Sequence, residues 1–379
     1  KILFITTRNP YSGRFSGDVI GSLKIINFLR KKYKVDIVAL NKKKIKKKNI
    51  IFFAQPNFLL KIFYIFLSLC KTQPLQFGLF QSEEMKQHIQ KVADNYDLLF
   101  FYHIRSSQYQ PKKYKGKIII EMGDLYSDNY FQTFCNLNVL NPLKYIYLIE
   151  SFLVKKIENS IFINFDKIIL FSNNEVKKIN KIFKKKIFTI SLSVNSSHNK
   201  FSLSKKSNKI LFIGNLGYLP NLLAVKNFIN KILPSLRTKI PNIKFFIVGN
   251  VTKINKFFLS FHKNVIFVGQ QSNIKDYIKN SFCGLANLNI ATGIQGKVLT
   301  YMSYGLPVIC SKKVSINFKN YVLDYKNNDE LIKKIIDLKN NKKLSNKFSK
   351  KSLKFVKKLN NNKIFFKYLK IVNFSKKLS

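Results

Sequence analysis

Short, almost wholly apolar runs recur along the first half of the chain and alternate with longer segments of helical period. The runs are Lys1–Thr6, Val35–Leu40, Asp97–Tyr102, Lys117–Glu121 and Lys167–Phe171. Val19–Lys32 and Ile146–Phe162 lie between them and carry apolar residues at helical spacing. Strands that are apolar on both faces are typical of parallel sheets covered by helices, so this half predicts repeated β-α-β units. We expect the Lys/Asn run Asn41–Asn49 to be an exposed loop.

The same alternation restarts after a polar, Ser/Lys-rich stretch, Asn199–Asn208, which we interpret as a linker. The second set of apolar runs is Lys209–Ile213, Lys244–Val248, Val265–Val268, Phe282–Leu285 and Pro307–Cys310. A chain of 379 residues is long enough for two cores. The sequence therefore predicts an α/β chain with two Rossmann-like domains, 1–198 and 199–345, facing each other across a cleft. Residues 346–379 form a Lys-rich segment of helical pattern, which could pack back toward the first domain.

The formal net charge is +50, from 68 Lys plus Arg against 18 Asp plus Glu. Such a charge by itself suggests nucleic-acid binding. However, nearly all the cations are Lys, spread over the whole chain, whereas Arg is the better residue for bidentate recognition of phosphate and bases. We therefore interpret the lysines as solvated surface and predict no nucleic-acid partner. Attraction of this surface to anionic lipid head groups stays open.

The four cysteines, Cys70, Cys135, Cys283 and Cys310, are far apart, and none forms a C-x-x-C pair. We expect neither a disulfide framework nor a metal site, and a reducing cytoplasm fits this pattern. The first residues already have the pattern of a strand, so we expect no signal peptide. Phe58–Cys70 is the most apolar helical stretch, but it is too short for a membrane span. We expect it to bury one face in a core, with a place on a membrane surface as the alternative.

A glycine-bearing loop opens a helix within Thr292–Ser311 (T-G-I-Q-G-K-V-L-T-Y-M-S-Y-G-L-P-V-I-C-S). Gly293 and Gly296 flank the turn, and Lys297 follows in the first helical turn. Backbone N–H groups at a helix start bind anions, helped by the helix dipole. The segment therefore predicts a phosphate site, although glycines that serve only a tight turn would give the same pattern.

The stretch K-V-L-T-Y-M-S-Y-G-L-P-V-I resembles the helix–strand signature of the group 1 glycosyltransferases, a retaining family with the GT-B fold. Ile210–Pro234, with I-L-F-I-G-N-L-G-Y-L-P-N, is similar to the first strand, loop and helix of that family's donor domain. Ile240–Gly249 and Asn264–Asp276 continue the pattern in order. P-Y-S-G-R-F-S-G-D and H-I-R-S-S-Q-Y in the first half are weaker matches.

The resemblance implies that the second domain binds the nucleotide-sugar donor and the first domain binds the acceptor. The donor-binding residues would be Gly13, Gly17, Gly214, Asn215, Gly293, Ile294, Gln295, Lys297 and Thr300. Lys297 and the backbone N–H groups of 293–295 would neutralise the donor diphosphate. The family has glutamates at the positions of Thr292 and Thr300, so the charged contact to the ribose is missing, and the Thr300 hydroxyl could supply one weaker bond.

In the first domain, Asp124 follows a strand within E-M-G-D-L-Y-S, which resembles the family's acceptor-side loop. It could position or deprotonate an acceptor hydroxyl, or it could cap the next helix. His103 ends the preceding strand, where it could polarise a hydroxyl or be a histidine satisfied by its neighbours. Arg105 could hold an acceptor phosphate, pair with Asp124 or lie on the surface. The Ser172-x-x-Glu175 spacing favours a capping box.

These features indicate a hexosyltransferase-like enzyme that moves a sugar from a nucleotide sugar to a hydroxyl of a glycan or a lipid-linked acceptor. Asp124, His103 and Lys297 are the predicted catalytic residues. The resemblance implies retention of configuration and independence of metal, and we expect no cofactor beyond the donor substrate itself. We expect a cytoplasmic location with peripheral contact to an anionic membrane. A GT-B nucleotide-sugar epimerase and a catalytically degenerate sugar- or nucleotide-binding protein stay open as alternatives.

Overall fold

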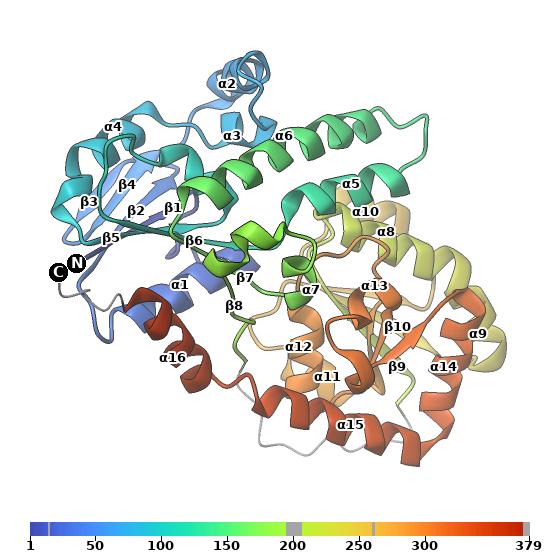
Figure 1. Cartoon of the computed structure of the whole chain (residues 1–379). Coiled ribbons are helices and arrows are strands. Elements are labelled where there is room, and N and C mark those ends of the chain that lie inside the picture. The colour runs from blue at the N-terminus through green and yellow to red at the C-terminus, as the bar shows by residue number, and fades with distance from the viewer. Residues whose placement is uncertain (14–15, 195–206, 260–261, 374–379) are drawn as a thin grey trace. The chain divides into compact units, whose positions relative to one another are not determined.

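A computed structural model describes residues 1–13, 16–194, 207–259 and 262–373. Contacts within the chain divide it into two compact units (Figure 1). The first unit contains Lys1–Ser191 together with the chain from Phe365 onward, and the second contains Leu192–Ile364. The predicted boundaries, at 198/199 and 345/346, therefore differ from the boundaries of these units. Most of the predicted linker Asn199–Asn208 lies outside the described residues.

The first unit is built on a sheet that has eight strands in the described residues. They are β1 (Ile2–Thr6), β2 (Val35–Asn41), β3 (Ile45–Lys47), β4 (Ile50–Ala54), β5 (Leu98–Tyr102), β6 (Lys117–Gly123), β7 (Lys167–Leu170) and β8 (Ile187–Thr189). Their order is β3-β4-β2-β1-β5-β6-β7-β8, and β3 pairs antiparallel to β4 while the other pairs are parallel. Each predicted strand of this half has its counterpart in the sheet.

The prediction of a loop at Asn41–Asn49 is wrong, because β3 forms there. All three residues of β3 are exposed, so it carries no buried apolar run that a sequence pattern could reveal. The turn into β4 places Asn49 at a φ of 65°, a conformation that Asn tolerates better than most residues. The strand therefore depends on the pairing along the edge of β4 rather than on burial of its own side chains.

Helices cover the faces of this sheet. They are α1 (Gly17–Leu29), α2 (Phe58–Cys70), α3 (Leu75–Leu79), α4 (Glu83–Val92), α5 (Tyr126–Asn136), α6 (Leu143–Asn164) and α7 (Asn173–Val176), with short 3-10 turns at Ala93–Asn95, Ile104–Tyr109 and Lys181–Lys186. The central strands are buried on both faces, with Phe4 and Phe100 stacked at 5.2 Å between ring centroids. Burial on both faces explains why the sequence of each central strand is a continuous apolar run.

Helix α2 forms as predicted, but the expectation that it buries one face in a core is wrong. Of its thirteen residues, all within the described chain, Ser68 alone is buried. Its main neighbour is the short helix α3, and the contact is between backbones: a Cβ on Gly78 would lie 2.5 Å from the Tyr64 carbonyl oxygen. A five-residue helix in such close backbone contact offers too little apolar surface to cover α2.

The second unit is built on a parallel sheet that has six strands in the part of the unit that the structure describes, in the order β11-β10-β9-β12-β13-β14. Its strands are β9 (Lys209–Ile213), β10 (Lys244–Val248), β11 (Val265–Gly269), β12 (Cys283–Ala286), β13 (Val308–Ser311) and β14 (Leu323–Tyr325). Its helices are α8 (Leu219–Asn227), α9 (Leu233–Lys239), α10 (Lys253–Leu259), α11 (Lys275–Lys279), α12 (Gly296–Ser303), α13 (Lys312–Ser315), α14 (Asn328–Asn340) and α15 (Lys342–Lys357), with a π turn at Phe228–Ile232 and a 3-10 turn at Lys319–Tyr321. This arrangement is doubly wound, as predicted.

In each sheet the strand order reverses at one place. The first sheet grows from β1 toward β2 and then continues on the other side of β1 with β5. The second grows from β9 toward β11 and then continues on the other side of β9 with β12. Loops that leave the carboxyl ends of such paired strands diverge and leave a crevice, so these two edges are where each unit can bind a ligand.

The last described helix, α16 (Asn361–Val372), returns to the first unit from Phe365 onward. There, Tyr368 is buried and its hydroxyl donates a 2.5 Å hydrogen bond to the carboxyl group of Glu121 in β6. Phe28 of α1 packs on both Phe365 and Tyr368. Each helix in the described part of the chain lacks either the length or the apolar character that crossing a lipid bilayer would require.

Replacing Glu121 by Gln should remove part of the pH dependence of stability. Burial raises the pKa of Glu121 from 4.5 to about 8, although the bond from Tyr368 opposes the rise. The folded chain therefore holds a proton that the unfolded chain releases. This contribution to the free energy of unfolding is full below pH 4.5 and is lost as the pH rises through about 8. In thermal melts between pH 5 and pH 8, we expect Glu121→Gln to gain stability relative to the wild type as the pH rises.

The matched control is Glu83→Gln, at an exposed position on α4. It should follow the wild-type pH profile. Parallel profiles for wild type and Glu121→Gln would contradict the assignment of this proton to Glu121.

Candidate functional site

The crevice edge of the second unit is formed by the loops that follow β9 and β12. Tyr301 ties these loops together, because the Ile213 N–H at the end of β9 donates a 2.6 Å bond to the Tyr301 hydroxyl of α12. Gly214 and Asn215 follow β9, while 293–295 lead directly into α12. The sheet topology therefore brings the predicted donor-binding residues of this unit to one edge.

Lys297 lies in the first turn of α12, and its ammonium has two neutral neighbours. Its Nζ donates a 2.6 Å hydrogen bond to the Asn221 side-chain oxygen and lies 3.9 Å from the centroid of the Phe212 ring. Asn221 in turn donates a 2.9 Å bond to the Asn215 carbonyl oxygen. Asn221 thus links two predicted donor-site residues. Neither Asn221 nor Phe212 was predicted as a site residue from the sequence, although Asn221 is the Asn of the L-P-N motif that follows the loop after β9.

Burial lowers the pKa of Lys297 to about 7. An amide oxygen and an aromatic face attract the ammonium, but neither carries a negative charge that would offset its lost hydration. At neutral pH the side chain is therefore divided between its charged and neutral forms. An anion bound beside it would favour the charged form and raise this pKa.

The backbone is closely packed around the same edge. A Cβ on Gly214 would meet the Asn221 side chain at 2.9 Å, and a Cβ on Gly249 would lie 2.1 Å from the Gly214 carbonyl oxygen. Gly249 also has a φ of 145°. Glycine at these two positions keeps the loop after β9 against the end of β10, and larger residues would force it away.

The loop before α12 is organised by its own side chains. Gly293 has a φ of 57° and its carbonyl oxygen accepts a bond from the Asn317 side chain. Gln295 donates to the Thr292 carbonyl oxygen at 2.9 Å, and Thr292 is buried. The Thr300 hydroxyl donates to the Gly296 carbonyl oxygen at 3.0 Å within α12. To donate a hydrogen bond to a ribose, the Thr300 hydroxyl would have to give up its bond to Gly296. It is therefore better placed to accept a hydrogen bond from a ribose hydroxyl.

In the first unit, the corresponding edge carries two arginines and one histidine. Arg8, just after β1, pairs with Asp18 of α1 at 2.7 Å, and Arg105 lies 3.6 Å from the same carboxylate. Of the options for Arg105, pairing with Asp124 is wrong, because its ionic partner is Asp18. Gly17 opens α1 beside Asp18, with no atom within 4 Å of an added Cβ. Gly13 precedes it at a φ of 69°.

His103 follows β5 in a strained conformation, with φ 72° and ψ 145°. Its Nε2 lies 2.5 Å from the Tyr126 hydroxyl and 3.4 Å from Arg105 Nη2. Arginine can only donate, so Nε2 must accept and the ring proton must be on Nδ1. Nδ1 is buried without a hydrogen-bond partner among the described residues. Burial, Arg105 and Arg8 all lower the pKa of His103, so it is a neutral ring that presents an unused N–H donor.

Asp124 does not cap the next helix, since the N-cap of α5 is Leu125 and its cap lacks a side-chain bond. Instead, Asp124 has a buried Oδ1 without a partner in the described chain. The predicted capping box at Ser172 forms only in part. Ser172 accepts a 3.1 Å hydrogen bond from the Asn174 N–H, but Glu175 accepts a 2.8 Å bond from the Leu125 N–H instead of reaching back to Ser172. Burial raises the pKa of both Asp124 and Glu175, and the charge of Asp124 adds to the rise at Glu175. One of the two carboxyl groups therefore keeps a proton near neutral pH.

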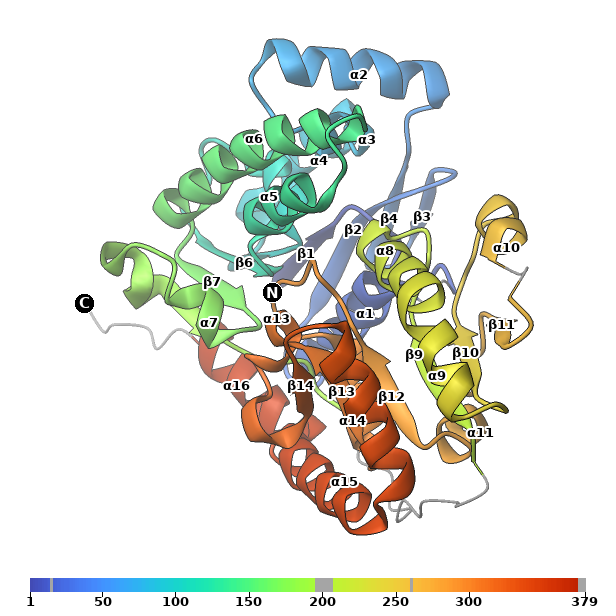
Figure 2. The same ribbon diagram turned by 90° about the vertical axis from the view of Figure 1, so that its right-hand side faces the viewer.

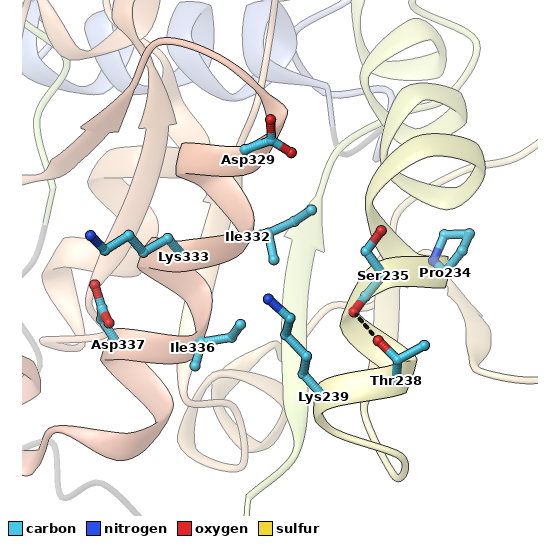
Figure 3. A pocket seen from close by; sticks show the side chains of 9 residues that line it. All are labelled: Pro234, Ser235, Thr238, Lys239, Asp329, Ile332, Lys333, Ile336 and Asp337. Carbon is cyan, nitrogen blue, oxygen red and sulfur yellow. Dashed lines mark hydrogen bonds between the residues drawn. The ribbon is translucent and has the colours of Figure 1, made fainter.

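A further depression of about 820 Å³ lies on the second unit between α9 and α14 (Figure 3). It is lined by Ser235, Lys239, Asp329 and Asp337, among others, and contains none of the predicted site residues. Within the described residues, groups of three or more His, Cys, Asp or Glu side chains that could hold a metal ion are not found.

The strained backbone of His103 predicts a difference in stability between two variants that both lack the His103 side chain. His103→Gly removes the cost of the positive φ, which His103→Ala keeps, so the Gly variant should be more stable than the Ala variant by about 1 kcal/mol. Denaturant unfolding of the two variants measures this difference. At Ser107, in the 3-10 turn at negative φ, the same two substitutions should show the opposite order. Equal stabilities of the two His103 variants would refute the strain.

Residues 207–341 match the family model described as glycosyl transferases group 1. In sequence, no curated protein matches the chain. In structure, sucrose-phosphate synthase from Thermosynechococcus elongatus is similar at a TM-score of 0.72 and 14% identity, with 98% of each chain covered. HepE of Anabaena in complex with UDP is similar at a TM-score of 0.65 and 12% identity, again with 98% of each chain covered.

A third similar structure is an α,α-trehalose-phosphate synthase (UDP-forming) from Burkholderia xenovorans, in complex with glucose-6-phosphate. Its TM-score is 0.65 at 7% identity, with 98% of this chain and 99% of the other covered. These similarities extend over both units, whereas the family match lies within the second. The chain therefore has the two-sheet GT-B fold and carries a group 1 glycosyltransferase domain over residues 207–341, which makes it a glycosyltransferase.

Proposed function

We propose that the chain transfers a sugar from a nucleotide sugar to a hydroxyl of a glycan or lipid-linked acceptor, with retention of configuration and without a metal ion. The donor would bind at the second unit and the acceptor at the first. The observation that carries this proposal is the half-buried ammonium of Lys297 in the first turn of α12, which contacts an amide oxygen and an aromatic ring. A diphosphate is the group that would complete its environment.

In this proposal, the second unit supplies positive charge where the leaving diphosphate develops its negative charge. Lys297 contributes its ammonium, and the N–H groups at 293–295 and at the start of α12 contribute the positive end of a helix dipole. Because these groups carry the charge that a metal ion would otherwise supply, we propose that the reaction is independent of metal. The bond between the sugar C1 and the phosphate oxygen would break, and the acceptor oxygen would bond to C1 on the face that the phosphate leaves. The departing phosphate oxygen would take the proton of the acceptor hydroxyl, and the sugar would keep its configuration because attack and departure share one face.

In the first unit, His103 and Asp124 would hold the acceptor. The Nδ1–H of His103 would donate to a sugar or acceptor oxygen, and the raised pKa of Asp124 suits it to share a proton with a hydroxyl. UDP is the first nucleotide to test, since it is the nucleotide bound in the HepE structure. We propose a cytoplasmic location with peripheral contact to an anionic membrane, which suits a lipid-linked acceptor.

A second candidate is a sugar- or nucleotide-binding protein without transferase activity. It is favoured by one observation: Thr300, at the position of a family glutamate, uses its hydroxyl proton within its own helix. Turnover separates the two candidates. Release of UDP from a UDP-sugar in the presence of a polyprenyl-linked sugar supports the transferase, whereas tight UDP binding with no release under any acceptor supports the binding protein.

Lys297→Ala should lose most of the stabilisation that a nucleotide diphosphate provides. At a ligand concentration of about 100 times Kd, binding adds about 2.7 kcal/mol to the free energy of unfolding, which a thermal-shift panel of nucleoside diphosphates detects. Lys226→Ala, at an exposed position on α8, is the matched control and should keep the full shift. If neither wild type nor control responds to any nucleotide, the donor site is wrong.

The affinity for UDP should fall as the pH rises above 7. Free Lys297 has a pKa of about 7, and the bound diphosphate favours its charged form, so binding takes up a proton at higher pH. The expected loss approaches tenfold per pH unit until the pH reaches the pKa of the complex. Isothermal titration between pH 6 and pH 9 measures it. Lys297→Arg keeps its charge throughout and serves as the reference for the nucleotide's own titration. Equal slopes for the two proteins would contradict this role of Lys297.

A further inference from the structure

Helix α2 exposes an unusually apolar surface for a helix of a water-soluble domain. Phe58 and Leu59 are 76% and 74% exposed, and Phe63 and Phe66 are more than half exposed. Its sequence, FLLKIFYIFLSLC, carries one charged residue, Lys61. Figure 2 shows α2 at the outer edge of the first unit, with its neighbours on one side of it. Contiguous apolar exposure of this kind marks an interaction surface.

Helix α6 also exposes apolar side chains. Its first half exposes Ile146, Ile149 and Phe152, and the loop before it exposes Leu140 almost completely. The two helices are joined at one end, because Lys156 of α6 donates a 2.9 Å bond to the Thr72 hydroxyl just after α2. We call the exposed residues of α2 and of the first half of α6 the α2–α6 surface.

Among the charged residues of α2 and α6, those that are not buried are all lysines. Lys61, Lys71, Lys155 and Lys156 lie on or beside the two helices. The two carboxylates of α6, Glu150 and Glu158, are both buried. Glu150 accepts from the backbone N–H groups of Leu75 and Gln76, and Glu158 accepts from Ser127. The helices thus turn their acidic groups inward and leave lysines outside.

From this combination we propose that the α2–α6 surface docks on an anionic lipid bilayer. Phenylalanine and leucine beside lysine fit the boundary between acyl chains and anionic head groups. A second copy of the chain fits poorly, since pairing would bring two chains of net charge +50 together. At 13 residues, α2 is about 20 Å long, so it would lie in the interface rather than cross it. This proposal rests on the membrane contact included in the proposed function and names the surface that makes it, but it does not depend on the transfer reaction.

The test is flotation of the full chain with two kinds of vesicle. One kind is phosphatidylcholine alone, and the other is phosphatidylcholine with about one third phosphatidylglycerol. We expect binding to the anionic vesicles, weakened by salt. The triple variant Phe58→Ser/Phe63→Ser/Phe66→Ser should bind them on the order of 100-fold more weakly, because it removes three inserted rings. The affinity of the double variant Lys71→Gln/Lys156→Gln for the anionic vesicles should fall about fivefold for each lysine removed.

The matched controls lie on α10 of the second unit, where Ile254 and Phe257 are also exposed. Ile254→Ser/Phe257→Ser and Lys253→Gln/Lys256→Gln should bind like the wild type. Circular dichroism melts check that each variant is folded. The proposal is overturned if the wild type stays unbound, if the controls lose as much binding as the α2 variants, or if the chain forms a dimer that the triple variant abolishes. UDP binding and UDP release are measured without vesicles. Failure here therefore removes the proposed membrane contact but leaves the proposed sugar transfer standing, and loss of sugar transfer would leave the membrane contact standing.

Discussion

Burial of the central strands on both faces is the constraint on which the rest of this structure depends. Phe4, Phe100 and Phe212 lie in strands whose side chains are removed from water on either side of the sheet. Such strands have no free side chain to offer to a substrate, so polar chemistry is confined to the loops at their ends. The reversal of strand order beside β1 and beside β9 then selects one crevice edge in each unit. His103 and Lys297 each lie at one of these edges.

Both edges hold ionisable side chains whose hydrogen bonds or charge are not fully compensated within the described chain. In the second unit, Lys297 has an amide oxygen and an aromatic ring as neighbours, and burial lowers its pKa to about 7. In the first, His103 is neutral with an unused donor, and a buried oxygen of Asp124 lacks a partner in the described chain. Burying polar groups without full compensation costs stability, and so does the positive φ of His103. A bound substrate that pairs with these groups would recover part of that cost.

The surface follows a different physical rule from the core. The high net charge is carried by lysines that stay hydrated, whereas the carboxylates of α6 are drawn inward to pair with backbone N–H groups and Ser127. This separation leaves a basic exterior around α2. The apolar side chains of α2 are exposed because α3 is too short to cover them. Exposure of α2 is therefore a consequence of what surrounds it and could not be inferred from its own composition.

The sequence by itself determined two sheets of mainly parallel strands, the position of most of these strands to within a few residues, and the glycine loop before α12, because buried strands and helix starts have local signatures. Tertiary structure decided the partners. Asn221 accepts a hydrogen bond from Lys297, which lies 76 positions later in the sequence, and Arg105 forms its ion pair with Asp18 rather than with Asp124. Strand β3 forms without a buried residue, and α2 remains uncovered. These outcomes depend on which surfaces the folded chain brings together, and such contacts leave no periodic trace along the sequence.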